Sequence, residues 1–194
     1  MNTKEHILSG ARKVFERFGF QKTSMSDIAL AARKGRRTIY SHFDSKEAVF
    51  KAVIDTEVKA LSKKLQEIAR QDQAPDLKLR SYLQARMRAI RELSVYYAAL
   101  REDLLQNMGV VETLRQEYDQ LEISIIKGML DEGNEAGIFR VADTRLVAEA
   151  ILIATKGFEL PIFMGKRDYD NERHILPMID VLYEGIRAKP ERPG

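Results

Sequence analysis

Residues 23–50 read TSMSDIALAARKGRRTIYSHFDSKEAVF, and this stretch decides the fold. Ser24 is placed to cap a short helix, because Asp27 three positions later can reach back to its amide and close a capping box. The apolar face of this helix comprises Ile28, Ala29 and Ala32. The first half of the stretch therefore predicts a short helix that begins directly after Ser24.

The second half predicts another short helix, which Gly35 opens as its N-cap. Ile39 and Phe43 lie four positions apart, so both can anchor this helix in a core. The side chains that point elsewhere are mostly cationic or aromatic: Arg36, Arg37, Thr38, Tyr40 and His42. Two short helices with basic residues at the turn between them indicate a helix-turn-helix that docks on DNA.

A third helix start follows directly, since Asp44 and Ser45 can cap a segment that begins at Lys46. The free amides and the positive dipole end of that segment can hold a phosphate beside the Lys46 ammonium. Three helix starts therefore converge on one basic surface.

Charge is distributed unevenly along the chain. Residues 1–51 contain 11 Lys and Arg against 5 Asp and Glu, whereas the remainder contains 21 against 24, giving net charges of +6 and −3. A polyanion-binding head on a neutral-to-acidic body has this pattern. An isolated basic run often only faces water, but this run lies between two capped helices. We expect a DNA-binding domain over residues 1–51, a helical domain over 52–188 and a tail over 189–194.

From about Ile7 to Phe50 the sequence resembles the TetR family of bacterial transcriptional repressors. The resemblance rests on Phe18-Gly19-Phe20, Thr23-Ser24, Asp27-Ile28-Ala29, Thr38-Ile39-Tyr40-Ser41-His42-Phe43 and Ser45-Lys46-Glu47. At the turn the family most often has Gly-Val-Ser-Lys-Gly, whereas this chain has Arg33-Lys34-Gly35-Arg36-Arg37. Because positive φ angles disfavour non-glycine residues, Arg33 predicts a strained or reshaped turn, and we expect Gly35 to absorb part of that change.

The resemblance implies an all-α homodimer that represses transcription until a small-molecule effector binds. Its N-terminal three-helix bundle would hold the helix-turn-helix, and its C-terminal helical domain would bind the ligand and dimerise. Two recognition helices 34–36 Å apart require a palindromic or near-palindromic double-stranded operator. The guanidinium groups of Arg36 and Arg37 suit guanine, whereas Lys34 offers a point charge. The DNA-binding candidates are Ser24, Lys34, Gly35, Arg36, Arg37, Thr38, Tyr40, His42 and Lys46.

After Phe50 the chain predicts only helices, because it lacks strand-like alternation. Long helices are expected over Lys46 to about Ala69 and from about Val111 to Glu135, with Gly137 as the stop of the second. Between them, an apolar stripe comprises Leu79, Leu83, Met87 and Ile90. The last two helices are expected over Asp143 to Phe163 and Asn171 to Ala188.

These last two helices carry more apolar surface than one core needs, which indicates a four-helix interface with a second copy. The helix over Asp143 to Phe163 has one stripe of Val147, Ile151, Ala154 and Phe158 for its own core. The interface candidates are Leu146, Ala150, Ile153, Gly157, Ile179, Leu182, Tyr183 and Ile186. The alternative is that all these stripes pack within one protomer.

The candidates for an effector pocket are Tyr82, Arg86, Tyr96, Tyr97, Tyr118, Met129 and Phe158. Aromatic and methionine side chains at helical spacing are more often plain core filler. Arg86 borders an apolar stripe, so it either extends to water or meets a buried anion such as a ligand carboxylate.

Other classes of function find little support. The chain has no cysteine, so disulfides and thiolate metal sites are excluded, and the expected location is the cytoplasm. The N-terminus does not resemble a signal peptide, and the most apolar segment, 146–164, contains charged residues that oppose a membrane span. There is no catalytic motif and the three histidines are scattered, so we expect no enzyme, cofactor or metal. The competing possibility is a helical interaction module whose basic head binds an acidic partner or surface.

Overall fold

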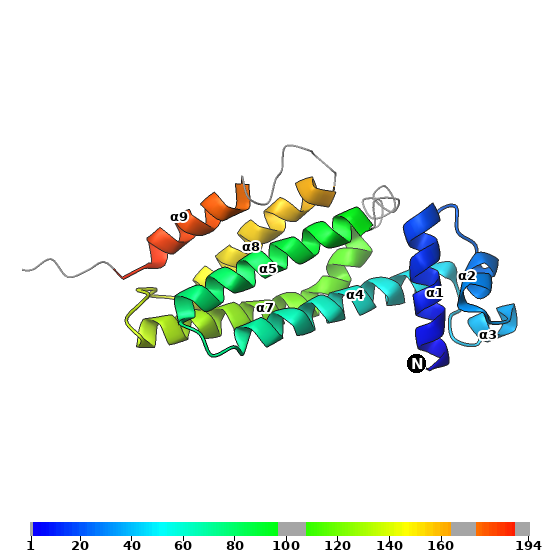
Figure 1. Cartoon of the computed structure of the whole chain (residues 1–194), viewed down its shortest axis with the longest axis horizontal. Helices are drawn as coiled ribbons and strands as arrows, with labels where there is room; N and C mark the ends of the chain where they lie inside the picture. Colours follow the sequence, from blue (N-terminus) through cyan, green and yellow to red (C-terminus); the bar gives the residue numbers. More distant parts are fainter. Residues whose placement is uncertain (1, 97–107, 164–173, 189–194) are drawn as a thin grey trace, which may run out of the picture. The chain divides into compact units, whose positions relative to one another are not determined.

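The computed structural model describes residues 2–96, 108–163 and 174–188, and these ranges are almost entirely helical (Figure 1). Helix labels follow Figure 1, in which α5 is followed by α7. The helices are α1 (Thr3–Phe18), α2 (Met25–Ala32), α3 (Arg36–Tyr40), α4 (Lys46–Ala69), α5 (Pro75–Tyr96), α7 (Met108–Glu135), α8 (Thr144–Phe163) and α9 (Leu176–Ile186). Within the described ranges the only β-type pairing is an isolated bridge between Phe139 and Arg187. The prediction of an all-α fold is confirmed.

The chain divides into two compact units. The first comprises residues 1–60 and 93–116, and the second comprises residues 61–92 and 117–194. Helices α4, α5 and α7 each contribute residues to both units. The functional boundary expected after residue 51 stays a prediction.

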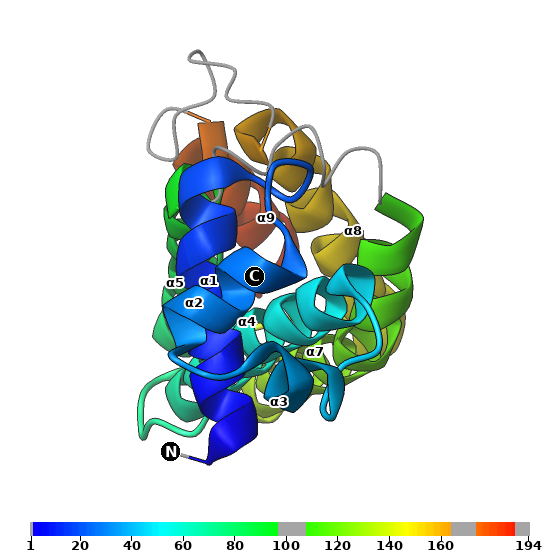
Figure 2. The ribbon, with the colours of Figure 1, turned by 90° about the vertical axis from the view of Figure 1, so that its right-hand side faces the viewer.

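The first unit is built on a close approach of α1 to α2 (Figure 2). Gly10 of α1 is buried, and a Cβ atom added to it would lie 2.6 Å from the backbone nitrogen of Ala32 in α2. A side chain at position 10 would therefore force the two helices apart. The rings of Phe15, Phe20 and Phe50 fill the centre of this core, with centroids 5.0 to 5.9 Å apart.

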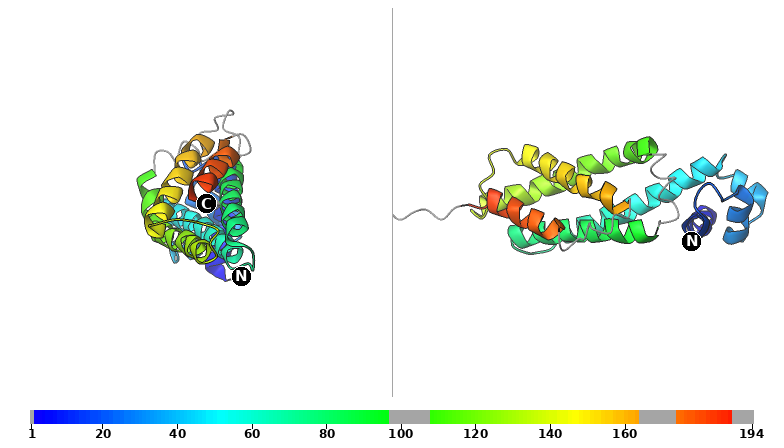
Figure 3. Two further views of the ribbon diagram at one scale, coloured as in Figure 1. Left: turned by 90° about the vertical axis from the view of Figure 1, so that its left-hand side faces the viewer. Right: turned by 90° about the horizontal axis from the view of Figure 1, so that it is seen from above.

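The second unit places α5, α7, α8 and α9 alongside one another (Figure 3). The α5 stripe predicted from the sequence, comprising Leu79, Leu83, Met87 and Ile90, is buried. Helix α7 ends at Glu135, and Gly137 follows with φ +68°, a left-handed conformation that glycine adopts without strain. Gly137 therefore acts as the predicted stop.

The end of α9 is fixed to the segment that follows α7. The amide of Arg140 donates to the carbonyl of Ile186 at 2.8 Å, and the amide of Ala188 donates to the carbonyl of Ile138 at 2.9 Å. These two backbone bonds fix the end of α9 within the second unit.

No helix in the described ranges is long and apolar enough to cross a membrane.

Candidate nucleic-acid interface

The start of α2 has the predicted capping box. The Asp27 amide donates to Ser24 Oγ at 3.2 Å, and the Ser24 amide donates to Asp27 Oδ2 at 2.8 Å. The Ser24 hydroxyl donates to the same carboxylate at 2.6 Å, and this hydrogen bond is the main reason that the pKa of Asp27 is lowered. In this arrangement the Ser24 hydroxyl proton is directed at Asp27, so any hydrogen bond from this DNA-binding candidate to a phosphate would compete with the capping box.

The turn after α2 is strained at one residue. Arg33 has φ +52° and ψ +44°, and it is the only non-glycine residue with positive φ among the described residues. This conformation costs on the order of 1 kcal/mol for a residue with a Cβ atom. Gly35 has φ −66° and ψ +149°, which any residue adopts. The expectation that Gly35 absorbs part of the strain was wrong, because the left-handed cap of α2 falls two residues earlier.

Helix α3 starts after Gly35, as predicted, but it lacks a side-chain cap. The carbonyl of Gly35 accepts hydrogen bonds from the amides of Thr38 and Ile39 at 2.9 and 3.2 Å. Ile39 is fully buried, and Phe43 is buried just beyond the end of the helix. These two anchors hold a helix of only five residues against the core of the first unit, so its remaining side chains are directed elsewhere.

Four cations, Arg33, Lys34, Arg36 and Arg37, form what we call the basic surface. Lys34 is half-buried and the three arginines are exposed. None of these four side chains makes a hydrogen bond or an ion pair with another residue in the described part of the chain. No described carboxylate therefore neutralises these four positive charges. Such open charge attracts a polyanion, because each phosphate contact releases condensed counterions.

Other predicted contact residues surround the basic surface in the sequence. Tyr40 is 45% exposed and His42 is exposed, whereas Thr38 is half-buried. Lys46 differs, because its Nζ atom donates to the carbonyl of Phe20 at 2.8 Å and lies 4.2 Å from the centroid of the Phe20 ring. Its ammonium thus has a partner inside the first unit, which the sequence pattern did not reveal.

The start of α4 is capped by a neighbouring side chain. Ser45 Oγ accepts a hydrogen bond from the amide of Ala48 at 3.1 Å, as predicted for this helix start. The pKa of Glu47 is lowered, chiefly by its own backbone amide, so a negative charge already lies in the first turn. An anion at this helix start would share the terminal amides with Glu47.

The candidates for the effector pocket fall into three groups. Tyr82, Arg86 and Met129 are buried, whereas Tyr118 and Phe158 are half-buried. Tyr97 lies outside the described residues, and only the backbone of Tyr96 is described. The hydroxyl of Tyr82 is buried and has no hydrogen-bond partner among the described residues, and this burial raises the pKa of Tyr82.

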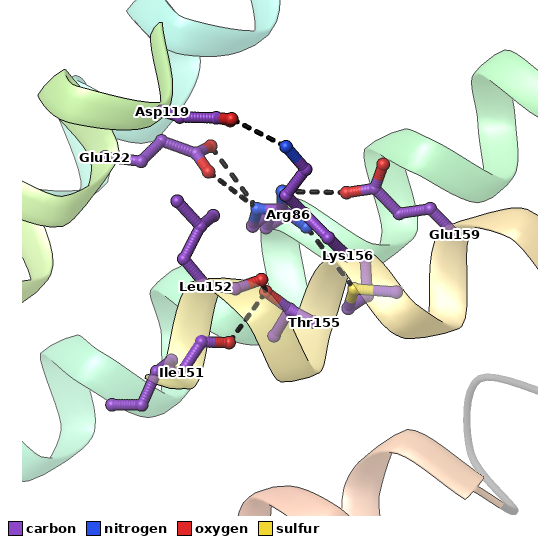
Figure 4. A network of polar contacts seen from close by, with 9 residues as sticks. Arg86, Asp119, Glu122, Ile151, Leu152, Thr155, Lys156 and Glu159 are labelled. Carbon is purple, nitrogen blue, oxygen red and sulfur yellow. Dashed lines mark hydrogen bonds and ion pairs between the residues drawn. The ribbon is translucent and has the colours of Figure 1, made fainter. Parts of the chain in front are cut away.

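Arg86 meets buried anions, but these anions belong to the protein. Its Nε atom donates to Glu122 of α7 at 3.0 Å, and its Nη2 atom lies 2.7 Å from Glu159 of α8 (Figure 4). Close by, Lys156 of α8 pairs with Asp119 of α7 at 2.6 Å. The ligand carboxylate suggested for Arg86 is therefore not required to balance its charge. Glu159 carried a signal in the sequence, since it interrupts an apolar segment, but no local pattern linked either glutamate to Arg86.

The candidates for a dimer interface separate into two helices with different exposure. On α8, Leu146 and Ile153 are 61% and 71% exposed, and Ala150 and Gly157 are exposed as well. On α9, Ile179 and Ile186 are buried within their own protomer, so the expectation fails for these two, whereas Leu182 and Tyr183 are half-buried against the same core and their role in an interface stays a prediction. Together with Leu79 and Leu83 of α5, these four line a small hollow within the second unit.

The stripe assigned to the core side of α8 also needs correction. Ala154 is exposed, whereas Ala148, Ile151, Leu152 and Thr155 are buried. Val147 and Phe158 of the predicted stripe are only half-buried against this core, so the buried face is centred to one side of that stripe. It includes Thr155, whose hydroxyl is satisfied by the carbonyls of Ile151 and Leu152. A buried threonine of this kind reads as polar in a hydropathy pattern.

Comparison with known proteins bears on the same region. The sequence profile of the bacterial regulatory proteins, tetR family, matches residues 7–53. The HTH-type transcriptional regulator YhgD of Bacillus subtilis (strain 168) is 26% identical over 156 residues, covering 78% of this chain and 80% of that protein. The A-factor receptor protein of Streptomyces griseus is 27% identical, with 98% of this chain and 68% of that protein covered.

A solved structure shares the fold. The transcriptional regulator from Cytophaga hutchinsonii has a TM-score of 0.81 at 22% identity, with 94% of this chain and 97% of that chain covered. The profile match contains the capped helix α2, the basic surface and helix α3. The match identifies residues 7–53 as an N-terminal helix-turn-helix domain of the tetR family of bacterial regulatory proteins, and this domain marks the chain as a DNA-binding transcriptional regulator.

Proposed function

We propose that the protein is a homodimeric repressor that binds a palindromic or near-palindromic operator and is released from it by a small-molecule effector. The observation that carries the DNA-binding part is the basic surface, whose four cations have no side-chain partner in the described residues. Open cations at the start of a short helix suit both phosphates and the acceptor edge of guanine. The effector part rests on the resemblance to the family and on one relative that is named as a receptor, the A-factor receptor protein.

Within this surface we assign base readout to Arg36 or Arg37, because both lie in the first turn of α3 and are exposed. A guanidinium can donate two parallel hydrogen bonds to the O6 and N7 atoms of guanine. Alanine at the reading position should cost about 1–3 kcal/mol on the cognate site and much less on other sequences. If both alanine variants weaken every sequence equally, the two arginines contact phosphates instead.

For the dimer we propose the exposed apolar stripe of α8, comprising Leu146, Ala150, Ile153 and Gly157. The support is that Leu146 and Ile153, two large apolar side chains on one face of α8, are both exposed. An apolar face left open in this way often marks an interaction site. Ile153→Asp should convert the dimer into a monomer in light-scattering measurements on a sizing column. Leu77→Asp is the matched control, because Leu77 is 56% exposed on α5 and outside the proposed interface. If both variants have the same oligomeric state, the proposal that α8 forms the interface is wrong.

The effector site is proposed for the second unit, around the buried Tyr82 and Met129 and the half-buried Phe158. Arg86 is not assigned a ligand, because Glu122 and Glu159 already accept from it. A panel of small apolar compounds, tested for release of labelled operator, would identify an effector. Phe158→Ala should then weaken release while leaving operator affinity unchanged.

The experiment that tests the whole proposal is a selection of genomic fragments on immobilised protein at several salt concentrations, with Arg37→Ala as control. Enrichment of a palindromic site that is lost in the variant supports the repressor. Salt-sensitive binding without any sequence preference would instead favour an interaction module with a basic head.

A further inference from the structure

Arg33 has a left-handed backbone conformation that glycine would adopt with less strain. It ends α2 in the left-handed region at φ +52°, where a Cβ atom is strained and glycine is not. Its amide donates to the carbonyl of Leu30 at 3.1 Å, and the amide of Lys34 donates to the carbonyl of Ala29 at 3.0 Å. Both bonds are made by backbone atoms. A glycine would therefore form the same turn with less strain.

The side chain of Arg33 makes no contact that would repay this strain within the protein. It is exposed, and it forms no hydrogen bond or ion pair with the rest of the described chain. The cap of α2 explains the left-handed backbone but not why arginine stands there instead of glycine, and strained residues concentrate at ligand-binding sites.

We propose that Arg33 contacts a DNA phosphate and that this contact is why the turn carries an arginine. The turn leads directly into α3, whose first turn holds the arginines assigned to base readout. With α3 in the major groove, Arg33 would lie beside the groove edge, within reach of the sugar-phosphate backbone. A phosphate contact fixes the register of the helix without reading sequence. This inference rests on the proposed binding of DNA, and it adds a residue to that site.

The test compares three substitutions at this position. Arg33→Gly and Arg33→Asn both remove the charge and suit the left-handed conformation, whereas Arg33→Lys keeps the charge. The matched control is Arg70→Asn, because Arg70 is also exposed and has no side-chain partner in the described residues. Each variant is assayed for melting temperature and for binding to the selected operator and to a scrambled duplex over a range of salt.

We expect Arg33→Gly and Arg33→Asn to melt at or above the temperature of the wild type and yet bind both duplexes about tenfold more weakly. The slope of log affinity against log salt should fall by about 0.9 for each head that loses the contact. Arg33→Lys should retain the wild-type slope, and Arg70→Asn should bind like the wild type.

Unchanged affinity and slope in Arg33→Gly, with the wild type still selecting its operator, would overturn this inference alone. A loss confined to the operator would also overturn it, because Arg33 would then read a base. Absence of any operator preference in the wild type itself would instead count against the proposed function.

Discussion

Arginines in the two units of this chain stand in opposite environments. Arg36 and Arg37 of the first unit are exposed and have no side-chain partner among the described residues. Arg86 of the second unit is 1% exposed and is held by Glu122 and Glu159. A cation that meets its anions within the protein contributes to the folded state, whereas a cation left open costs little to fold and remains available to a partner. Position in the fold, not residue type, separates structural from functional charge here.

The largest effect on stability is expected when Arg86, the buried and paired cation, is removed. Arg86→Met should lower the free energy of unfolding by about 3–5 kcal/mol, because two buried carboxylates would lose their shared partner. Urea unfolding followed by circular dichroism measures this change. Arg70→Met serves as the control and should change stability by less than about 0.5 kcal/mol. A loss below about 1 kcal/mol for Arg86→Met would show that the two glutamates do not depend on Arg86 for their stabilisation, for example because water hydrates them.

A smaller effect of opposite sign is expected at Tyr82, whose buried hydroxyl has no hydrogen-bond partner in the ranges that the structure describes. Tyr82→Phe should raise the free energy of unfolding by about 1 kcal/mol, because it removes an unsatisfied polar group without changing the ring. The control is Tyr183→Phe, since the Tyr183 hydroxyl donates to Asp76 Oδ2 at 2.7 Å. Destabilisation by Tyr82→Phe would indicate that this hydroxyl has a partner in solution.

The pair of Tyr183 and Asp76 gives a test by pH. Burial and the Asp76 carboxylate raise the pKa of Tyr183 to about 12, above the value of about 10 in an unfolded chain. Its stabilising contribution is therefore complete below pH 10 and is lost as pH rises toward 12. The Tyr183 hydroxyl lowers the pKa of Asp76, so that contribution is lost at acidic pH.

Melting temperatures of the wild type and Tyr183→Phe, measured from pH 7 to pH 11, should converge at the alkaline end. The difference at neutral pH should correspond to about 1 kcal/mol or less, because the pair is partly exposed to solvent. A constant difference over this range would mean that the hydroxyl does not titrate as its surroundings predict.

The smallest effect on stability is expected where the effect on function is greatest. A double variant, Arg36→Ala with Arg37→Ala, should unfold within about 0.5 kcal/mol of the wild type, since neither side chain forms a hydrogen bond or ion pair with a described residue. Its affinity for operator DNA should fall steeply. A marked loss of stability would mean that these arginines stabilise the fold as Arg86 does. The contrast between exposed, unpaired arginines and a buried, paired one would then no longer hold.

Local features of the fold could be predicted from the sequence, because their partners lie within one helical turn. The box formed by Ser24 and Asp27, the strain at Arg33 and the anchors Ile39 and Phe43 all follow from spacing and residue type. Each depends on geometry that a few residues determine by themselves.

Contacts between distant segments could not be predicted in the same way. The partners of Arg86 come from two other helices, and the carbonyl that binds Lys46 belongs to Phe20, 26 positions away. Helix α9 shows a related limit, since an apolar stripe reveals that a face will be covered but not by which surface. For Ile179 and Ile186 the covering surface is their own protomer.

The absence of a side chain at Gly10 determines how this regulator can be recombined with its relatives. Because α2 rests on α1 with its backbone only 2.6 Å from where a Cβ would lie, neither helix tolerates replacement of the other by a version with a larger residue there. A chimaera that borrows a foreign turn and recognition helix should keep α1 and α2 together as an inherited pair. We therefore expect a chimaera that exchanges α1 without α2 to be destabilised when the incoming helix places a larger residue at position 10.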